Sequence, residues 1–600
     1  MSSKQPQYSG IKFLFGLIVF SPVVYTTALM DIQLAQKMFF FCFAVILFLS
    51  QILKYESDKS ILFYKPLFLL VLLFPLTFFT SFINGSESLL ILQLTNLATP
   101  LSIILLTIFI FMILGEERFF KTVSFSVVVV ATLFSIIGLL EVYGQKIIVL
   151  PTIIGPGSTL GHRSFAAEFL LPSLPFVLIL KNYVQRKNQY ILIIVSFIQI
   201  SFLLFTRNRS SMIILLAIVL LFFLFVLLKK GRKEKLKIIL PVAAVVLVSF
   251  LFALQDVKGV QRPEMESTVQ TFFDTNYKSN KLRLKYWDAS LQMIESNPLA
   301  GIGIMKWSGY FPKYSGDYFN DDNIFYVQSI HSHNDFLELA SENGLASSIV
   351  FVLIIFFVCY SLFKRIKLNE NYFLLLLSFF VTLAFSLVAF PFQKFSSYFL
   401  ASIAVGIGLV NDKRVMRSYI DIKVKYLKIV TLAVIIISIF VAFIRINSEV
   451  KLKEAIAYKE NKIYFQMLQK LEDVSQVFYP FDPSKQPVDY YRGLANYRLH
   501  RLNEALNKNL SAKELAPFNP IVLRNVIGVH QASGDIEKAE QMYEQYKNMF
   551  PNCIDPQINL LIIYTKRGEK EKAEKLFSEL EKKAPDNPRF LEFKNKLNPN

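Results

Sequence analysis

The sequence predicts an all-α fold, in which a polytopic helical membrane protein is followed by a helical domain outside the membrane. Apolar residues make up 54% of the 600 positions, 59 residues are phenylalanine, and mean hydropathy is +0.44. This is too apolar for a soluble chain of that length. The apolar residues form long runs joined by short basic connections, as expected of a chain that crosses a bilayer repeatedly. Beyond residue 446 the composition turns polar and typical of helices.

Each long apolar run is interpreted as one transmembrane helix, because about 20 helical residues cross a hydrocarbon core roughly 30 Å thick. The first run has no small-residue cleavage site, so we expect a retained anchor rather than a removable signal peptide. About twelve to thirteen transmembrane helices are predicted, near residues 11–29, 33–53, 61–83, 89–114, 119–141, 164–180, 190–206, 210–228, 237–254, 344–363, 371–390, 396–411 and 427–445.

Basic residues set the predicted orientation, because short loops rich in Lys and Arg stay on the cytoplasmic side. They fall in every second connection, beginning with Lys4 and Lys12 and including KKGRKEKLK at 229–237. The N-terminus is therefore expected inside, and the alternate connections and the chain from about residue 446 outside. This predicts a membrane protein whose C-terminal domain lies on the outer side of the membrane. Much of the net charge of +19 is explained by topology and requires no nucleic acid partner.

The exported part contains an internal repeat of 34 residues. The residues that recur at this interval are Pro483, Pro517, Pro551, Pro585, Ala505, Ala539, Ala573, Gly534 and Gly568. Small residues allow paired helices to touch closely, and the prolines are expected to end each second helix. The pattern resembles tetratricopeptide repeats, which form an α-solenoid. A plain helical hairpin with coincidental spacing is the alternative.

Three domains follow from these patterns. We predict a membrane domain over 1–445, a helical linker over 446–483 and a repeat domain over 484–600. Repeat domains of this kind usually present a concave surface to a protein or peptide. The tail therefore suggests a protein partner rather than chemistry of its own.

The residues suited to chemistry gather on the predicted outer face. All five histidines lie there, and both tryptophans, Trp287 and Trp307, fall in one external loop over 255–343. A connection of this length between spans is expected to be functional or to form a small domain. The three cysteines predict no disulfide framework, and no zinc pattern is present. The active site is therefore expected at the outer membrane face.

Two arginine-containing segments point to an anionic ligand. In TRNRSS (206–211), Arg207 and Arg209 stand directly before a span, where guanidinium groups can bind phosphate or anchor to membrane lipids. Arg283 is expected at the N-terminal end of a helix, where the helix dipole disfavours a cation. That placement suggests an anionic ligand, with an ordinary solvated face as the alternative. The apolar face of the same helix is predicted at Leu284, Trp287, Leu291 and Ile294.

The segment HSHNDFLELASENG (331–344) joins titratable groups to a helix start. His331 and His333 can converge from a strand or turn, and Asn334 is a suitable cap for a helix that enters the membrane. Glu338 lies on that helix. A histidine that titrates near neutral pH beside a carboxylate is suited to be a general base. The alternatives are a structural histidine and a metal-binding pair, for which no third ligand is evident.

A glycine-rich external turn, GPGSTLGHRSFAAE (155–168), precedes another predicted span. It places His162 and Arg163 close to the expected headgroup plane. These residues are suited to binding a phosphate or a sugar.

At these residues the chain resembles the O-antigen ligase and polymerase family of bacterial envelope glycosyltransferases. The family signature is His-Asn, nine residues, then Gly-x-x-x-Gly. Here it reads His333-Asn334 and Gly344, with Ser348 in place of the last glycine, and serine is also small enough for close helix packing. Further matches, within residues 155 to 411, are a Ser-Arg-like turn at Asn208-Arg209-Ser210-Ser211 and an Arg…Trp…Pro-Leu-x-Gly-x-Gly run at Arg283, Trp287, Pro298, Leu299, Gly301 and Gly303.

The resemblance implies transfer of a glycan from a polyprenyl-pyrophosphate donor to an acceptor hydroxyl, without a cofactor or a metal and with inversion. It also implies a bacterial cytoplasmic membrane protein whose active site and C-terminal domain face the periplasm. Arg209 and Arg283 would stabilise the leaving pyrophosphate, and His333 would remove the acceptor proton. Asn334 and Glu338 are expected to orient the imidazole. The other predicted substrate-binding residues are Trp287, which would stack on a sugar, and Arg207, His331, His162 and Arg163. The Ser-Ser that follows favours Arg209 over Arg207.

The acceptor remains open among lipid A-core, another lipid-linked glycan and a Ser or Thr of an exported protein. The lipid A-core ligase is preferred, although the fused repeat domain raises the case for a protein acceptor. A non-catalytic scaffold or a transporter is the alternative from another class. A transporter would be expected to carry ionisable residues in mid-span and discontinuous helices.

Overall fold

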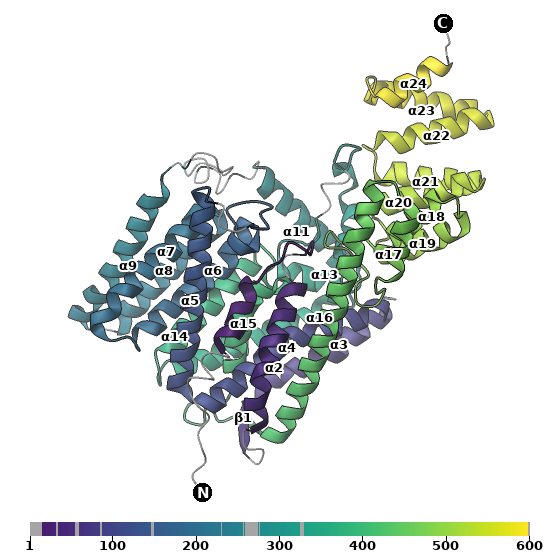
Figure 1. Cartoon of the computed structure of the whole chain (residues 1–600). Helices are drawn as coiled ribbons and strands as arrows, with labels where there is room; N and C mark the ends of the chain where they lie inside the picture. The colour runs from purple at the N-terminus through teal and green to yellow at the C-terminus, as the bar shows by residue number, and fades with distance from the viewer. Residues whose placement is uncertain are drawn as a thin grey trace.

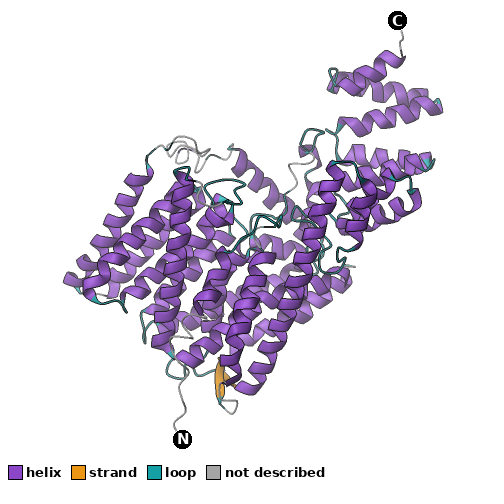
Figure 2. Ribbon diagram, viewed as in Figure 1, coloured by secondary structure: helices purple, strands orange, loops and turns teal. Residues whose placement is uncertain are grey.

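A computed structural model describes residues 15–31, 34–54, 59–84, 87–145, 149–229, 231–255, 257, 270, 274, 277–323 and 329–597. These residues are helical almost throughout, with one pair of short strands, as Figure 2 shows. The predicted all-α class is therefore confirmed. A bundle of long apolar helices forms one part of the molecule, and a stack of shorter helices extends from it (Figure 1).

The apolar helices follow the predicted runs closely. Over the described residues, eight helices are long and apolar enough to cross a membrane, and three shorter apolar helices accompany them. The predicted span at 11–29 begins outside the described residues. The helices that correspond to the other twelve runs are α2 (Ala35–Lys54), α3 (Leu70–Ile83), α4 (Glu87–Leu114), α5 (Glu116–Val142), α6 (Arg163–Lys181), α7 (Gln189–Phe205), α8 (Arg209–Lys229), α9 (Arg232–Ala253), α13 (Asp335–Arg365), α14 (Asn371–Ser386), α15 (Phe395–Leu409) and α16 (Val424–Glu460).

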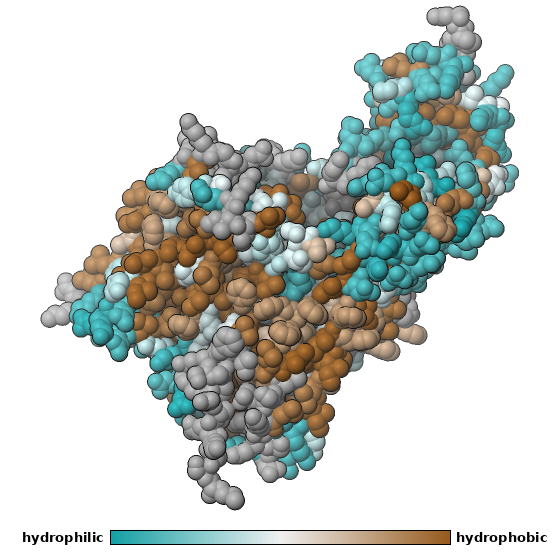
Figure 3. Space-filling model, in the orientation of Figure 1, coloured by the Kyte–Doolittle hydropathy of each residue, from teal (hydrophilic) through white to brown (hydrophobic). Residues whose placement is uncertain are grey.

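The bundle is apolar inside and outside. Its interior is a large core of buried aliphatic and phenylalanine side chains drawn from nearly all of these helices. Figure 3 shows that apolar side chains also cover much of the bundle surface, whereas the stack of repeats is hydrophilic. An extended apolar surface is stable in contact with lipid rather than water, which agrees with a multi-pass membrane protein.

A short β-pairing joins two connections at the end of the bundle remote from the repeats (Figure 1). Strand β1 (Ser60–Tyr64) runs antiparallel to β2 (Tyr419–Lys423). The span predicted at 61–83 therefore starts too early, because a strand and a 3-10 turn at Lys65–Leu69 precede α3. The pairing of Ser60 with Lys423 also places both connections on one side of the bundle, as predicted.

The long loop predicted at 255–343 contains structure of its own. It holds α11 (Lys278–Ser296), α12 (Trp307–Tyr310) and the 3-10 turns Phe311–Tyr314 and Gly316–Tyr318. Parts of the loop, including 258–269 and 324–328, lie outside the described residues.

The apolar face predicted for α11 is wrong. Leu284 and Leu291 are 48% and 49% exposed, whereas the buried positions are Tyr286, Ala289 and Met293. The buried set also has helical spacing, so periodicity alone could not choose between the two faces.

Helix α16 continues well beyond its predicted span and leads through α17 (Tyr464–Glu472) into the repeats. The repeat helices are α18 (Val488–Arg498), α19 (Leu502–Leu515), α20 (Pro520–Ala532), α21 (Ile536–Met549), α22 (Ile554–Arg567), α23 (Lys570–Lys583) and α24 (Pro588–Leu597). Pro517, Pro551 and Pro585 each follow the second helix of a pair, as predicted. Pro483 does not, because α17 ends eleven residues earlier and a turn intervenes.

The repeats pack against the external loop rather than standing free. Trp307, Phe311 and Phe319 of the loop share a buried core with repeat residues such as Tyr546 and Phe550. Close approach needs glycine here, because a Cβ on Gly316 would lie 1.8 Å from the carbonyl oxygen of Met549. The carboxylate of Asp321 also accepts the amide N–H of Ile554, at 2.6 Å. The repeat domain is thus packed directly against the loop that carries α11.

Candidate functional site

The candidate site lies where α6, α8 and α13 begin and α11 passes over them. The segment HSHN forms a tight loop before α13, and Asn334 caps that helix by accepting the N–H groups of Phe336 and Leu337 at 3.0 and 3.1 Å. The prediction of a cap at Asn334 is therefore confirmed. Its amide nitrogen donates to the carbonyl oxygen of Leu387 at 3.1 Å, so the whole side chain is committed to structure.

Glu338 anchors the histidine loop. One carboxylate oxygen lies 2.6 Å from Nδ1 of His331, and the other accepts the N–H of Ser332 at 2.8 Å. The expected pairing of Glu338 with His333 is therefore wrong, because His331 occupies it. With its neighbours fixed in this way, His333 adopts a left-handed backbone with φ 57°. Such a conformation is uncommon for a non-glycine residue and is maintained by the surrounding contacts.

His333 stands between two aromatic rings. Its imidazole stacks on Tyr286 of α11 at 5.7 Å between centroids and meets Phe390 edge-on at 5.0 Å. Among the described residues no hydrogen bond reaches either ring nitrogen. Burial, helped by the positive charges of Arg283 and Lys394, lowers the pKa of His333 to about 3. The imidazole is therefore neutral near pH 7 and can accept a proton.

A group of cations surrounds this histidine. Arg283 is close enough to depress the pKa of His333, and its own pKa is lowered by burial and by the nearby Arg209. It lies in the second turn of α11, not at its N-terminal end as predicted, because the helix begins at Lys278. The dipole argument for Arg283 therefore fails, although the residue does face other cations.

Arg209 and Arg163 are brought together by the starts of two helices. Asn208 caps α8 by accepting the N–H of Ser211 at 2.8 Å, and its amide donates to Ser164 of α6 at 2.9 Å. This bond places the first residues of α8 and α6 side by side. The guanidinium of Arg209 lies 4.3 Å from the ring centroid of Tyr277, beside the first turn of α11.

Lys394 is a member of the cluster that the sequence did not single out. Its ammonium group lies 2.5 Å from the carboxylate of Glu168, both side chains are 2% exposed, and it sits 3.9 Å from the Phe390 ring. Burial lowers the pKa of Lys394, and Glu168 opposes that shift. The signal available in the sequence was a single lysine in a short external connection, against the charge bias of such loops.

The glycines of the family pattern join α11 to α13. Helix α13 is kinked at Gly344, whose φ is 78°. A Cβ at Gly344 would lie 2.0 Å from the carbonyl oxygen of Leu299, and one at Gly301 would lie 2.3 Å from that of Glu342. Backbone bonds from Ile302 to Ser341 and from Leu345 to Pro298 seal this contact. The two motifs thus fix the helix that carries Arg283 beside the one that follows His333.

Comparison with known protein families gives two matches. The family model described as O-antigen ligase matches residues 194–352. The resemblance to O-antigen ligases is confirmed. The matched range contains Arg209, Arg283 and His333, and a tetratricopeptide repeat model matches residues 530–597. No curated protein shows a significant match to the chain.

Two predicted ligand residues of the ligase region lie elsewhere. Arg207 is 2% exposed and donates to the carbonyl oxygen of Ala253 at 2.6 Å, which ties the α7–α8 turn to the end of α9. Its predicted role in binding the donor is corrected to a structural one. Trp287, predicted to stack on a sugar, packs against the core shared with the repeats, and the α11 ring that stacks on His333 is Tyr286.

A cavity of about 340 Å³ opens beside the histidine loop. His162, His331 and Lys394 line one wall, and Lys485 and Arg445 line it from the segment before the repeats and from α16. His162 caps α6 by accepting the N–H of Ser164 at 3.1 Å, and burial lowers its pKa to about 4. Over the described residues, no group of three or more His, Cys, Asp or Glu side chains is arranged to hold a metal.

Proposed function

We propose that the protein is an O-antigen ligase-type glycosyltransferase. It moves a glycan from undecaprenyl pyrophosphate to a hydroxyl group of lipid A-core at the periplasmic face of the inner membrane. The observation that carries this proposal is the neutral His333, whose ring nitrogens meet no hydrogen-bond partner among the described residues, set among Arg283, Lys394 and Arg209. A base beside clustered cations suits a reaction in which a hydroxyl attacks and an anion leaves.

The cations act on the leaving group. As the bond between the anomeric carbon and the pyrophosphate oxygen breaks, negative charge grows on the pyrophosphate. Arg283 and Arg209 stabilise that charge in a site already partly shielded from water, where electrostatic interactions are strong. Arg209 lies near enough to Arg163 to help lower its pKa, after the larger effect of burial, so Arg163 adds a third positive charge to this group. These residues replace the metal ion that many pyrophosphate-releasing enzymes use.

His333 acts on the acceptor. Its free nitrogen takes the hydroxyl proton while the acceptor oxygen bonds to the anomeric carbon, opposite the departing pyrophosphate. The reaction is a single displacement, so the anomeric configuration inverts. No covalent glycosyl intermediate forms, and the imidazolium then releases its proton to the solvent.

Donor binding raises the pKa of His333. A pKa near 3 makes His333 a weak base in the free enzyme, because burial and the cations disfavour its protonated form. A bound pyrophosphate offsets the charges of Arg283 and Lys394 and raises the pKa toward neutrality. General bases are most effective when their pKa is close to the working pH. His333 is therefore activated when the donor is in place.

The periplasmic orientation rests on the pattern of basic connections. The site, the external loop and the repeats share one side of the bundle, and the paired strands lie at the other (Figure 1). Basic residues such as Lys59 and Lys423 flank the strands, which favours the cytoplasm for that end. The site then faces the compartment in which polyprenyl-linked glycans await transfer.

A protein O-oligosaccharyltransferase is the second candidate. It is favoured by the docking of the repeat domain onto the loop that carries Arg283, which would hold a protein acceptor close to the site. An O-antigen polymerase would instead use a second lipid-linked glycan as acceptor.

Reconstitution of the full-length protein in nanodiscs tests these functions. Undecaprenyl-pyrophosphate-linked glycan is supplied with lipid A-core, with a Ser/Thr-containing exported protein, or alone. We expect a glycan ladder on lipid A-core together with released undecaprenyl pyrophosphate. Transfer only to the protein, or only between donor molecules, would select the corresponding alternative. Absence of transfer in all three mixtures, from a folded sample that binds the donor, would refute the proposal.

A further inference from the structure

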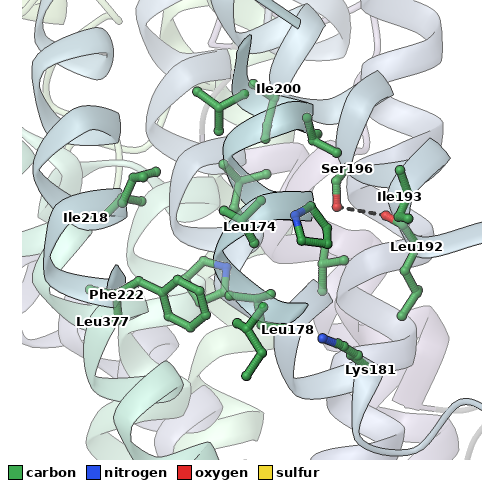
Figure 4. A pocket seen from close by; sticks show the side chains of 18 of the residues that line it. Leu174, Leu178, Lys181, Leu192, Ile193, Ser196, Ile200, Ile218, Phe222 and Leu377 are labelled. Atoms are coloured by element: carbon green, nitrogen blue, oxygen red, sulfur yellow. Dashed lines mark hydrogen bonds between the residues drawn. The ribbon is translucent and has the colours of Figure 1, made fainter. Parts of the chain in front are cut away.

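A pocket of about 220 Å³ lies between α6, α7, α8, α9 and α14, away from the candidate site. Figure 4 shows aliphatic and aromatic side chains converging on it from several helices. The side chains that define its walls include Leu174, Leu192, Ile200, Leu215, Ile218 and Phe222. Ser196 is the polar group in its middle, and its hydroxyl donates to the carbonyl oxygen of Leu192 at 2.7 Å. The body of the pocket therefore suits an apolar ligand.

Two lysines lie at one end of this pocket. Lys181 is the last residue of α6, and Lys237 lies in the second turn of α9. Helix α6 starts at the candidate site and α9 runs back toward that side, so both lysines lie at the end remote from the site. Neither lysine forms an ion pair with any acidic side chain in the described part of the chain.

An apolar slot with two ammonium groups at its mouth matches the chemistry of an anionic phospholipid. The boundary between hydrocarbon and headgroups is where lysines bind phosphate, and basic pockets between transmembrane helices recognise acidic headgroups. We propose that this pocket binds an acyl chain of an anionic glycerophospholipid from the leaflet opposite the candidate site, and that Lys181 and Lys237 hold its phosphate. This proposal does not depend on the transfer reaction.

The bound lipid has a structural role in the bundle. Helices α8 and α9 bury less of their surface within the protein than α6 does. An acyl chain in the pocket makes van der Waals contacts with the inner faces of α8 and α9 and so stabilises their positions in the bundle. Because α8 begins with Arg209, the lipid also supports the helix that presents this cation. The protein should therefore be more stable with an anionic lipid than with a zwitterionic one.

Native mass spectrometry and thermal unfolding of the full-length protein test the proposal. The detergent-solubilised protein is titrated with dioleoylphosphatidylglycerol or with dioleoylphosphatidylcholine. We expect retained phosphatidylglycerol and a higher unfolding midpoint than with phosphatidylcholine, because a ligand that binds the folded state stabilises it. The double variant Lys181→Ala/Lys237→Ala should weaken retention roughly 25-fold, at about fivefold for each lysine.

Two controls separate the pocket from general lipid association. Lys229 is an exposed lysine at the C-terminal end of α8 that does not line the pocket. The Lys229→Ala protein should therefore retain the lipid. Ile218→Trp fills the pocket and should displace the acyl chain, whereas Leu216→Trp, at an outward position 61% exposed, should not. Equal retention by the double variant and the wild type would overturn the proposal. So would equal stabilisation by the two lipids, or loss of binding in both tryptophan variants.

Discussion

Glu338 provides a sharp test of how the site is built, because its role here is to hold the histidine loop and not to contact the substrate. The substitution Glu338→Gln keeps the size of the side chain but removes its charge. One carboxylate oxygen lies 2.6 Å from Nδ1 of His331, and the other accepts the N–H of Ser332 at 2.8 Å. Glutamine presents one carbonyl oxygen and one NH₂ group to these two partners, so it cannot accept a hydrogen bond from each through a separate oxygen, and both bonds lose their charge assistance.

The size of the effect follows from these two bonds. Each charge-assisted hydrogen bond contributes about 1.5–3 kcal/mol. The left-handed backbone of His333 costs about 1–3 kcal/mol and is held by the same loop. Loss of the carboxylate therefore removes enough stabilisation for His333 to leave its position. Since a displacement of about 1 Å can lower a rate about 100-fold, we expect kcat to fall between about 10- and 100-fold.

The assay is glycan transfer by purified protein, with donor binding measured in parallel. Glu342→Gln is the matched control, because Glu342 is one turn further along α13 and accepts the N–H of Trp307 at 2.9 Å instead. It should leave the position of His333 unchanged and kcat within a fewfold of the wild type. A Glu338→Gln protein with wild-type kcat, or a larger loss in Glu342→Gln, would refute this account of the loop.

Three further outcomes are expected. Arg283→Met should lower kcat by about 100- to 1000-fold, as for removal of a group that stabilises transition-state charge. The same substitution removes a cation that repels protonated His333, so the pKa of His333 should rise from about 3. The acid limb of the kcat/KM profile should therefore move to higher pH. Treatment with EDTA should leave transfer unchanged, and a loss restored by a divalent cation would contradict the metal-free mechanism. Arg207→Met should lower the free energy of unfolding by about 1–3 kcal/mol, because the Arg207 side chain donates a hydrogen bond to the carbonyl oxygen of Ala253. The donor KM should be unchanged. An increased donor KM in a stable protein would show that Arg207 binds the donor.

Much of the fold could be predicted from the sequence, because membrane helices and 34-residue repeats leave strong periodic signals. The twelve apolar helices of the described part of the bundle and the three proline-terminated repeat pairs follow from hydropathy and spacing alone. The start of α3 could not be found in this way, because the strand SILFY is as apolar as a helix. The docking of the repeats on the external loop depends on contacts such as Gly316 with Met549, which no local pattern encodes.

The candidate site was predictable in its motifs but not in its pairings. Of the signature residues, His333 and Arg283 are brought together because the glycine motifs bind α11 to α13, and Arg209 joins them from the start of α8. Spacing along the chain could not tell which histidine Glu338 would meet, since both lie on the same loop. Lys394 was missed although it is a lone lysine in a short external connection, because its partner, Glu168, is more than two hundred residues away and no local pattern links the two charges.

Transfer by His333→Ala is the most direct test of the central claim that this residue is the base. The full-length variant is reconstituted with undecaprenyl-pyrophosphate-linked glycan and lipid A-core, and donor binding and membrane insertion are measured on the same sample. We predict normal insertion, retained donor binding and a loss of kcat of about 100- to 10,000-fold, the range expected for removal of a general base. Transfer at the wild-type rate by the His333→Ala protein would contradict the claim that His333 is the general base.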